Sequence, residues 1–209
     1  MKYIKVILFV IIGCLVFSSA NAELSKESIY KQLKSTYKGM ESISFNYSLS
    51  NNPNLMGSIQ AKKGNKYIIT MAERDIFCNG ETIWNVSKYD KKAIISQYEE
   101  DDDALSIENI FFYFLDKYKP SKLTKESTSK GSSHYVLTLI PRSSDNEYQG
   151  IQSITLWLGH NDLEITRVQL DSINGVNEFF ISNITRNKTI KDSLFNFTPP
   201  EDMEIIDFR

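Results

Sequence analysis

Apolar and polar residues alternate along most of this sequence, and that two-residue period constrains the fold more than any other feature. In residues 43–50, isoleucine, phenylalanine, tyrosine and leucine at the odd positions alternate with serine and asparagine at the even positions. Successive side chains of a β-strand point to opposite faces of the sheet, so this pattern is typical of a strand with one face in water. The sequence therefore predicts a protein made mainly of β-sheet.

Ten later segments carry similar strand patterns. They are Leu55–Lys63, Lys66–Met71, Asp75–Cys78, Thr82–Val86, Ala93–Tyr98, Lys122–Thr128, His134–Pro141, Ile151–Gly159, Leu163–Asp171 and Val176–Arg186. Turn sequences such as Asn79-Gly80 and Asn174-Gly175 separate neighbouring segments, and short connections of this kind join antiparallel strands. Together with residues 43–50, these segments predict about eleven antiparallel strands.

Two segments have the spacing of amphipathic helices instead. In residues 24–40 the apolar residues recur every three or four positions, and Ser25 is a candidate N-cap. The apolar residues of the second segment, residues 107–118, include Ile107, Ile110, Phe111, Phe114, Leu115 and Tyr118. A long sheet with one apolar face must curl to bury that face, and two helices can cover the open side of the curl. We therefore expect a strongly curved antiparallel sheet covered by helices.

The first 22 residues have the composition of a secretory signal peptide. Lys2 and Lys5 precede an apolar run at residues 6–17, and Ala20-Asn21-Ala22 places small residues at the positions that cleavage requires. The apolar run is shorter than the roughly 20 residues that a membrane-spanning helix needs. We expect cleavage after residue 22, export across a membrane, and a single domain formed by residues 23–209.

A second interpretation of this segment stays open. Residues 11–14, Ile-Ile-Gly-Cys, resemble the site at which bacterial lipoproteins are cleaved and acylated on the cysteine. The apolar run continues beyond Cys14, where a lipoprotein usually becomes polar, and a good cleavage site follows. Simple cleavage is therefore favoured over acylation.

The sequence gives little support for catalysis, cofactor binding or nucleic-acid binding. Loss of the first 22 residues removes two lysines and changes the formal charge from −2 to −4, which argues against a nucleic-acid partner. The histidines are His134 and His160, and neither lies in a recognisable nucleophile or metal motif. The acidic run at residues 99–103 lacks the alternating ligands of a calcium loop. Cys78 would be the one cysteine left after cleavage, so no intramolecular disulfide is expected. We predict a protein that is not an enzyme and has no metal or cofactor.

Aromatic residues make up 12% of the chain and are spread along nearly every predicted strand. Such side chains can fill the inside of a small, curved sheet. They can also line a cavity that holds an apolar ligand. Composition alone leaves both possibilities open.

Several short motifs occur in an order that resembles one known family. Residues 57–67 join a glycine at the start of a strand to a lysine pair and an aromatic residue, and residues 78–84 form an Asn-Gly hairpin leading to tryptophan. Residues 137–141 form a strand ending in proline, and residues 195–200 read Phe-Asn-Phe-Thr-Pro-Pro. With the N-terminal helix, these motifs resemble the outer-membrane lipoprotein carrier family, the LolA proteins.

The resemblance implies a fold and a function. The fold would be an unclosed antiparallel β-barrel of about eleven strands with an α-helical lid, around a hydrophobic cavity for the acyl chains of lipoproteins. The protein would be a monomeric periplasmic carrier. It would receive acylated lipoproteins from an inner-membrane ABC-type release complex and deliver them to an outer-membrane lipoprotein receptor. The alternatives with the same fold are an outer-membrane-anchored lipoprotein receptor and a general lipid-binding protein.

The resemblance and the alternating pattern together give a predicted site. The predicted cavity residues are Phe45, Tyr47, Ile59, Tyr67, Ile69, Trp84, Leu137, Leu139, Leu156 and Val168. The predicted lid residues are Leu33, Phe111, Phe114 and Leu115. The resemblance assigns a role in lid latching and cargo transfer to Lys63 and Tyr67. In this sequence lysine replaces the usual arginine at 63, and Gly64 stands where proline is common. A one-residue slip of any strand would exchange its two faces, so the faces are the weakest part of this assignment.

Overall fold

The computed structural model describes residues 24–99, 108–127, 133–143 and 150–209. The predicted signal peptide, Cys14 and residues 100–103 of the acidic run lie outside the described residues, as does Ile107.

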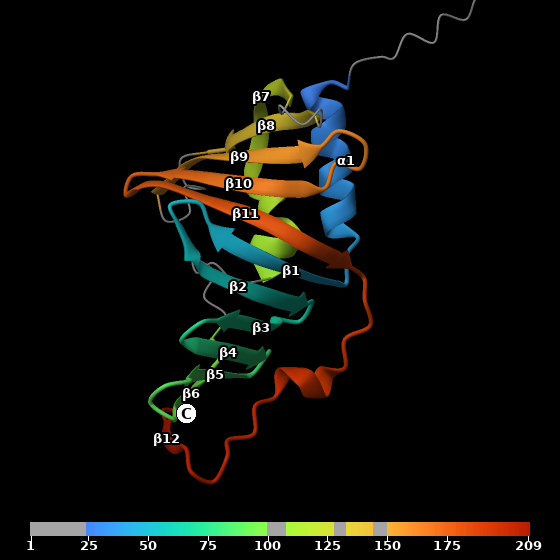
Figure 1. Cartoon of the computed structure of the whole chain (residues 1–209). Coiled ribbons are helices and arrows are strands. Elements are labelled where there is room, and N and C mark those ends of the chain that lie inside the picture. Colours follow the sequence, from blue (N-terminus) through green and yellow to red (C-terminus); the bar gives the residue numbers. More distant parts are fainter. Residues whose placement is uncertain (1–23, 100–107, 128–132, 144–149) are drawn as a thin grey trace, which may run out of the picture.

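The described residues form a mainly β fold built on one twelve-stranded sheet that does not close on itself (Figure 1). Its strands are β1 (Ser42–Leu49), β2 (Asn52–Lys62), β3 (Lys66–Met71), β4 (Arg74–Asn79), β5 (Thr82–Ser87), β6 (Lys92–Gln97), β7 (Tyr118–Ser127), β8 (Ser133–Pro141), β9 (Ile151–Gly159), β10 (Ile165–Ser172), β11 (Gly175–Arg186) and β12 (Glu204–Asp207). The strand order is β12-β6-β5-β4-β3-β2-β1-β11-β10-β9-β8-β7, so β12 and β7 are the two edges. The eleven predicted strands correspond to β1–β11, and their antiparallel pairing is confirmed.

The twelfth strand has no counterpart among the predicted segments. The segment β12 pairs with β6 in parallel, with Ile205 opposite Ala93 and Asp207 opposite Ile95. The chain reaches this position because the segment after β11 returns along the sheet to its far edge (Figure 1).

Turn chemistry explains why the hairpins form where they do. In the β4–β5 turn, the Asn79 side-chain oxygen accepts hydrogen bonds from the backbone N–H groups of Glu81 and Thr82, at 2.9 and 2.8 Å. Gly80 has a φ of +95°, and a Cβ there would lie 2.5 Å from the Gly64 carbonyl oxygen. Only glycine meets both conditions without strain.

Helix α1 (Lys26–Lys38) begins at Ser25, whose side chain accepts a hydrogen bond from the Ser28 N–H and so confirms the predicted N-cap. The helix packs against β7 and against residues 109–113. Its buried Tyr30 fixes this packing, because the hydroxyl lies 2.7 Å from the Leu115 carbonyl oxygen and accepts a hydrogen bond from Arg142.

Within the described residues, the second predicted helix ends one residue earlier than expected. It consists of a π-helical turn, η1 (Asn109–Tyr113), followed by α2 (Phe114–Lys117); η1 and α2 are together called the lid below. Tyr118, predicted to be helical, is instead the first residue of β7. Pro120 accounts for this early end, since a proline disfavours helical backbone at the residue before it.

Strands β4–β6 carry apolar side chains on both faces of the sheet. The inner face, defined here as the side that faces α1 and the lid, carries the main hydrophobic core. The outer face of β4–β6 carries a second cluster around Trp84, which is covered by Phe197 and Met203 of the segment after β11. The rings of Phe77 and Phe197 stack with their centroids 5.2 Å apart. This segment also contains a 3-10 turn, η4 (Asp192–Phe195), so the C-terminal part of the chain packs on the outer face.

Candidate functional site

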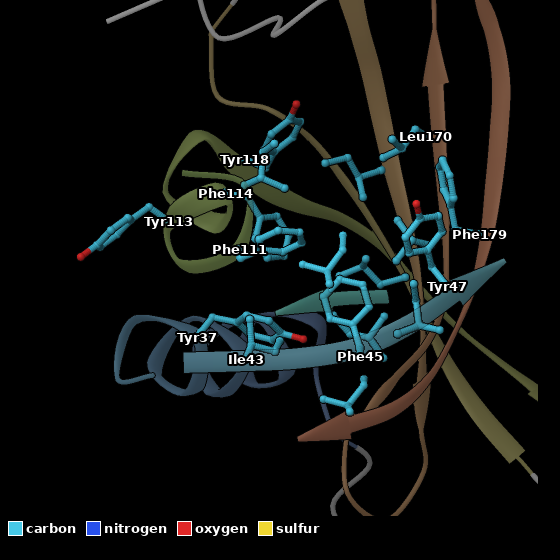
Figure 2. A pocket seen from close by; sticks show the side chains of 18 of the residues that line it. Tyr37, Ile43, Phe45, Tyr47, Phe111, Tyr113, Phe114, Tyr118, Leu170 and Phe179 are labelled. Atoms are coloured by element: carbon cyan, nitrogen blue, oxygen red, sulfur yellow. The ribbon is translucent and has the colours of Figure 1, made fainter. Parts of the chain in front are cut away.

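An apolar cavity of about 550 Å³ lies between the inner face of the sheet and the lid (Figure 2). Strands β1–β3 contribute Ile43, Phe45, Tyr47, Ile59 and Ile69. Helix α1, the lid and the start of β7 contribute Tyr37, Ile110, Phe111, Tyr113, Phe114, Lys117 and Tyr118. Strands β9–β11 contribute Ile151, Ile154, Leu156, Ile165, Val168, Leu170, Phe179, Ile181 and Ile184. Among these described lining residues, Lys117 is the one with a charged side chain.

Strand register brings the wall of the cavity together from distant parts of the sequence. Phe45 lies opposite Ile59, and Ile59 lies opposite Ile69, so these three side chains share the inner face. On the other side of β1, Tyr47 lies opposite Ile181 of β11. The alternating pattern of each strand therefore becomes a continuous apolar wall across the centre of the sheet.

Two rings of the lid close over this wall. The Phe111 ring meets the Phe45 ring edge to face, with centroids 5.4 Å apart, and Phe114 meets Tyr37 in the same way at 5.6 Å. Figure 2 shows Phe111 and Phe114 pointing from the lid into the cavity. Aromatic pairs of this geometry contribute about 0.5–1.5 kcal/mol each beyond the burial of their surface. The lid is thus held by contacts that a ligand in the cavity would have to replace.

A polar contact holds the beginning of the lid against the β2–β3 turn. The Glu108 carboxylate accepts hydrogen bonds from the backbone N–H groups of Gly64 and Asn65, both at 2.8 Å. A proline at position 64 would have no N–H to donate. The glycine that departs from the family pattern therefore supplies half of this contact.

Lys63, the predicted latch, contacts a different element. Its ammonium group donates to the Lys38 carbonyl oxygen at 3.2 Å and forms an ion pair with Glu41 at 3.1 Å. These contacts join the β2–β3 turn to the end of α1. Among the described contacts, the turn meets the lid through its backbone, while the Lys63 side chain is directed to the helix.

Apart from Lys63 and Trp84, the predicted site residues divide into two groups. Eight of them line the cavity: Phe45, Tyr47, Ile59, Ile69, Leu156, Val168, Phe111 and Phe114. Five others are buried in the packed core and do not line it: Tyr67, Leu137, Leu139, Leu33 and Leu115.

Trp84 is a correction to the predicted site. It lies in the outer-face cluster, opposite Phe77 and Ile95, and the inner-face position beside it is occupied by Ile83. Because residues 83 and 84 are both apolar, the alternation of apolar and polar residues does not show which of these two side chains faces inward.

Among the cavity residues of β10 and β11, Val168 is the one that the sequence predicted. Leu170, Phe179, Ile181 and Ile184 line the cavity, although the strands themselves were predicted. The alternation in β11 is visible in the sequence, but Phe179 and Phe180 are adjacent aromatic residues. The pairing of Phe179 with Leu49 and of Ile181 with Tyr47 settles the face.

Burial favours the neutral forms of Tyr37 and Tyr47, which line the cavity, and of Cys78 in the core beside it. Burial raises the pKa of Tyr37 to about 12, although the Arg186 guanidinium, which donates a hydrogen bond to this hydroxyl, opposes the shift. Burial also raises the pKa of Tyr47 and that of the Cys78 thiol. A protonated, fully buried thiol is a poor nucleophile. The apolar lining is therefore suited to holding an apolar molecule.

The raised pKa of Tyr37 predicts a loss of stability at alkaline pH. A group whose pKa is about 12 in the folded protein and 10 in the unfolded chain contributes stability below pH 10 that disappears as the pH rises through 12. We expect Tyr37→Phe to reduce the fall in unfolding free energy across this range by about 2–3 kcal/mol. Urea unfolding measured at several alkaline pH values tests this. The matched control is Tyr89→Phe, because Tyr89 is 75% exposed and its removal should leave the decline unchanged.

Two features are absent from the described residues. No group of three or more histidine, cysteine, aspartate or glutamate side chains is placed to hold a metal ion within residues 24–99, 108–127, 133–143 and 150–209. Over the same residues, no helix has the length and apolar character needed to cross a membrane.

One of the solved structures compared with this chain shows a shared fold. An uncharacterized conserved protein from Thermus thermophilus superposes with a TM-score of 0.53 at 11% identity, covering 87% of this chain and 98% of its own. LprF from Mycobacterium bovis gives a TM-score of 0.49 at 11% identity, over 85% of this chain and 97% of its own. The Mycobacterium tuberculosis lipoprotein LppX gives 0.49 at 13% identity, over 80% and 99%. At 11% identity, the likeness to the Thermus thermophilus protein concerns the fold alone.

The sequence itself identifies the family. No curated protein sequence matches the chain. The family described as "Outer membrane lipoprotein carrier protein LolA" matches residues 45–198, which is well over half of the chain and runs from β1 into the segment after η4. The chain therefore belongs to the LolA family of outer membrane lipoprotein carrier proteins.

Proposed function

We propose that this protein is a periplasmic carrier that binds the acyl chains of lipoproteins in its cavity and ferries them from the inner to the outer membrane. The observation that carries this proposal is the apolar cavity of about 550 Å³ under the lid, in a chain of the LolA family. Pockets of about 300–1,000 Å³ are the usual size for small-molecule ligands, and an apolar lining selects hydrocarbon. The inner-membrane ABC-type release complex and the outer-membrane receptor are the partners that this function requires.

The volume of the cavity sets how much hydrocarbon it holds. An engineered cavity of about 150 Å³ binds benzene, which corresponds to roughly 25 Å³ per carbon atom. On that scale this cavity holds roughly 22 carbons, which is one long acyl chain and part of another. A lipoprotein with two or three chains needs more room. Loading therefore requires the lid to move away from the wall.

Competition between lid and cargo would keep the affinity moderate. Each buried methylene contributes about 0.8 kcal/mol, so two or three chains in a rigid, empty cavity would bind almost irreversibly. In this protein the cargo must first displace Phe111 and Phe114 from Phe45 and Tyr37. The lost lid contacts reduce the net gain, and their return assists release.

Binding of a lipoprotein with and without its acyl chains tests the proposal. The purified protein is mixed with an acylated lipoprotein and, in parallel, with the same lipoprotein carrying serine in place of its acylated cysteine. We expect a complex with the acylated form only. Equal binding to both forms would contradict the proposal.

Mass spectrometry of the protein isolated from the periplasm separates the alternatives. Copurified acylated protein supports the carrier, and copurified phospholipid alone would indicate a general lipid-binding protein. An intact mass that includes lipid on Cys14 would indicate an anchored receptor.

Truncating a lid ring should strengthen acyl binding if lid and cargo compete. Phe111→Ala removes the contact with Phe45, which destabilises the empty closed state more than the loaded state, so we expect affinity for a fluorescent acyl probe to rise about tenfold. The control is Lys125→Ala on β7, which lies outside the cavity and should change the affinity by less than about twofold. A fall in affinity for Phe111→Ala would show that the ring is part of the binding wall rather than a competitor.

A further inference from the structure

Two neighbouring hairpin tips expose large aliphatic side chains at one end of the sheet. The β1–β2 tip, residues 50–57, carries Leu55 and Met56, which are 55% and 57% exposed. The β10–β11 tip, residues 172–177, carries Ile173 and Val176, which are 70% and 60% exposed. Isolated exposed aliphatic residues are common on proteins, but four on adjoining tips form a surface that requires an explanation.

The pairing of β1 with β11 places the two tips side by side. Leu49 lies opposite Phe179, and the Ser50 N–H donates a hydrogen bond of 2.8 Å to the Glu178 carbonyl oxygen. In Figure 1 the turn between β1 and β2 and the turn between β10 and β11 project in the same direction. The four side chains therefore belong to one end of the molecule.

Both tips are free of charge. Residues 50–57 and 172–177 contain no lysine, arginine, aspartate or glutamate. The carboxylates that flank the β10–β11 tip are paired within the protein: Asp171 accepts from the Ser153 hydroxyl at 2.7 Å, and Glu178 forms an ion pair with Arg167 at 2.7 Å. The β5–β6 tip differs, because it carries Lys88, Asp90 and Lys91. The uncharged surface is thus a property of these two tips and not of every turn.

The cavity wall runs up to the same two tips. Tyr47, which lines the cavity, lies opposite Gly57 at the end of the first tip. Leu170, which also lines it, lies opposite Asn177 at the end of the second. An acyl chain that leaves the cavity beside these residues therefore meets the exposed aliphatic side chains next.

We propose that the β1–β2 and β10–β11 tips insert into the surface of a lipid bilayer when the carrier loads or unloads. The inference rests on the proposed carrier function. A hydrocarbon chain that crosses water exposes every methylene, whereas tips in contact with the bilayer give it a continuous apolar route. Uncharged tips enter the interface without the cost of desolvating an ion, and the asparagines at 51, 52, 54 and 174 suit the head-group layer. Four side chains give weak, reversible binding, as a protein that shuttles between membranes requires.

Flotation with phosphatidylcholine vesicles, in the absence of any cargo, tests this inference. We expect the protein to bind these neutral vesicles and to stay bound at high salt, because the attraction is apolar. The test variant combines Leu55→Asp with Ile173→Asp, one substitution per tip, and should lower the vesicle partition coefficient by at least about tenfold. Position 176 is avoided because Val176 lies opposite Asp171, where a second carboxylate would destabilise the strands.

The matched control is Phe208→Asp. Phe208 is 71% exposed but lies beside β6 near the β12 edge, so this substitution should change the partition coefficient by less than about twofold. Circular dichroism and the urea midpoint confirm that each variant is folded. The inference is overturned if the protein does not bind vesicles, if salt releases it, or if Phe208→Asp releases it equally well.

A separate titration distinguishes this inference from the carrier function. Affinity for a soluble acyl probe reports on the cavity, and the double tip variant should retain it. If the unsubstituted protein does not bind the probe, the carrier function is refuted. The vesicle measurement then still tests whether the tips bind a membrane. A double variant that binds vesicles normally but fails only with a partner protein would show that the tips dock onto protein instead.

Discussion

Replacing Ile181 with aspartate should lower the affinity for an acyl probe about a hundredfold. Ile181 lines the cavity from β11 and lies opposite Tyr47 in the wall. An ionised carboxylate there loses its water when hydrocarbon enters, and an unpaired charge in an apolar site costs about 3 kcal/mol or more, equivalent to two orders of magnitude in affinity. Aspartate is used because its short side chain cannot extend out of the cavity as lysine can. Displacement of a fluorescent fatty-acyl probe measures the effect.

The adjacent residue provides the control. Ser182→Asp adds the same charge at the next position of β11, where the side chain is exposed on the outer face, and affinity should stay within about twofold. The pH dependence adds a second criterion. Burial raises the pKa of a carboxyl group, so the affinity of the Ile181→Asp protein should recover as the pH falls and the group becomes neutral. Equal losses for the two variants would show that the probe binds elsewhere.

Truncating Phe195 should produce the largest loss of stability among the aromatic residues of the C-terminal segment. Phe195 is completely buried in η4, which packs against β3 and β4 on the outer face. Removing a buried phenylalanine ring costs the transfer free energy of its carbons and leaves a cavity, which together amount to about 3–5 kcal/mol. Phe195→Ala should therefore lower the urea midpoint strongly without changing the slope of the transition.

Phe208→Ala is the control for this substitution. Phe208 follows β12 and is 71% exposed, so its truncation should change the unfolding free energy by less than about 0.5 kcal/mol. A small effect of Phe195→Ala would mean that the C-terminal segment is an appendage rather than part of the fold. The ion pairs of Lys62 and Lys66 with Asp192, both at 2.6 Å, attach the start of the same segment to the sheet.

The sheet could be predicted from the sequence because its signal is local. A two-residue period with turn sequences between segments identifies each of β1–β11 without knowledge of its neighbours. Strand β12 has no such signal, since its four residues place Ile205 and Ile206 side by side between Glu204 and Asp207. The end of the lid was misplaced because the apolar spacing of a helix continues through Tyr118, while backbone restriction near Pro120 ends the helix earlier.

The cavity was harder to predict because its wall depends on which face of each strand points inward. Polar neighbours decide the face in β1, and Phe45 and Tyr47 both line the cavity. In β5 and β11, adjacent apolar residues occupy both faces, and only strand pairing and the C-terminal cover decide between them. Pairing and the C-terminal cover place Trp84 on the outer face, although the hairpin that contains it was predicted from the sequence.

An open sheet gives this molecule a degree of freedom that a ring of strands lacks. In a closed barrel, the number of strands and their stagger fix the diameter of the barrel. In the part of the chain that the structure describes, β7 and β12 end the sheet without joining each other, so no such geometric lock exists. Small changes in the twist between many pairs of neighbouring strands can widen or narrow the space that the curved sheet encloses without breaking a backbone hydrogen bond. The same sheet can then hold ligands of different sizes.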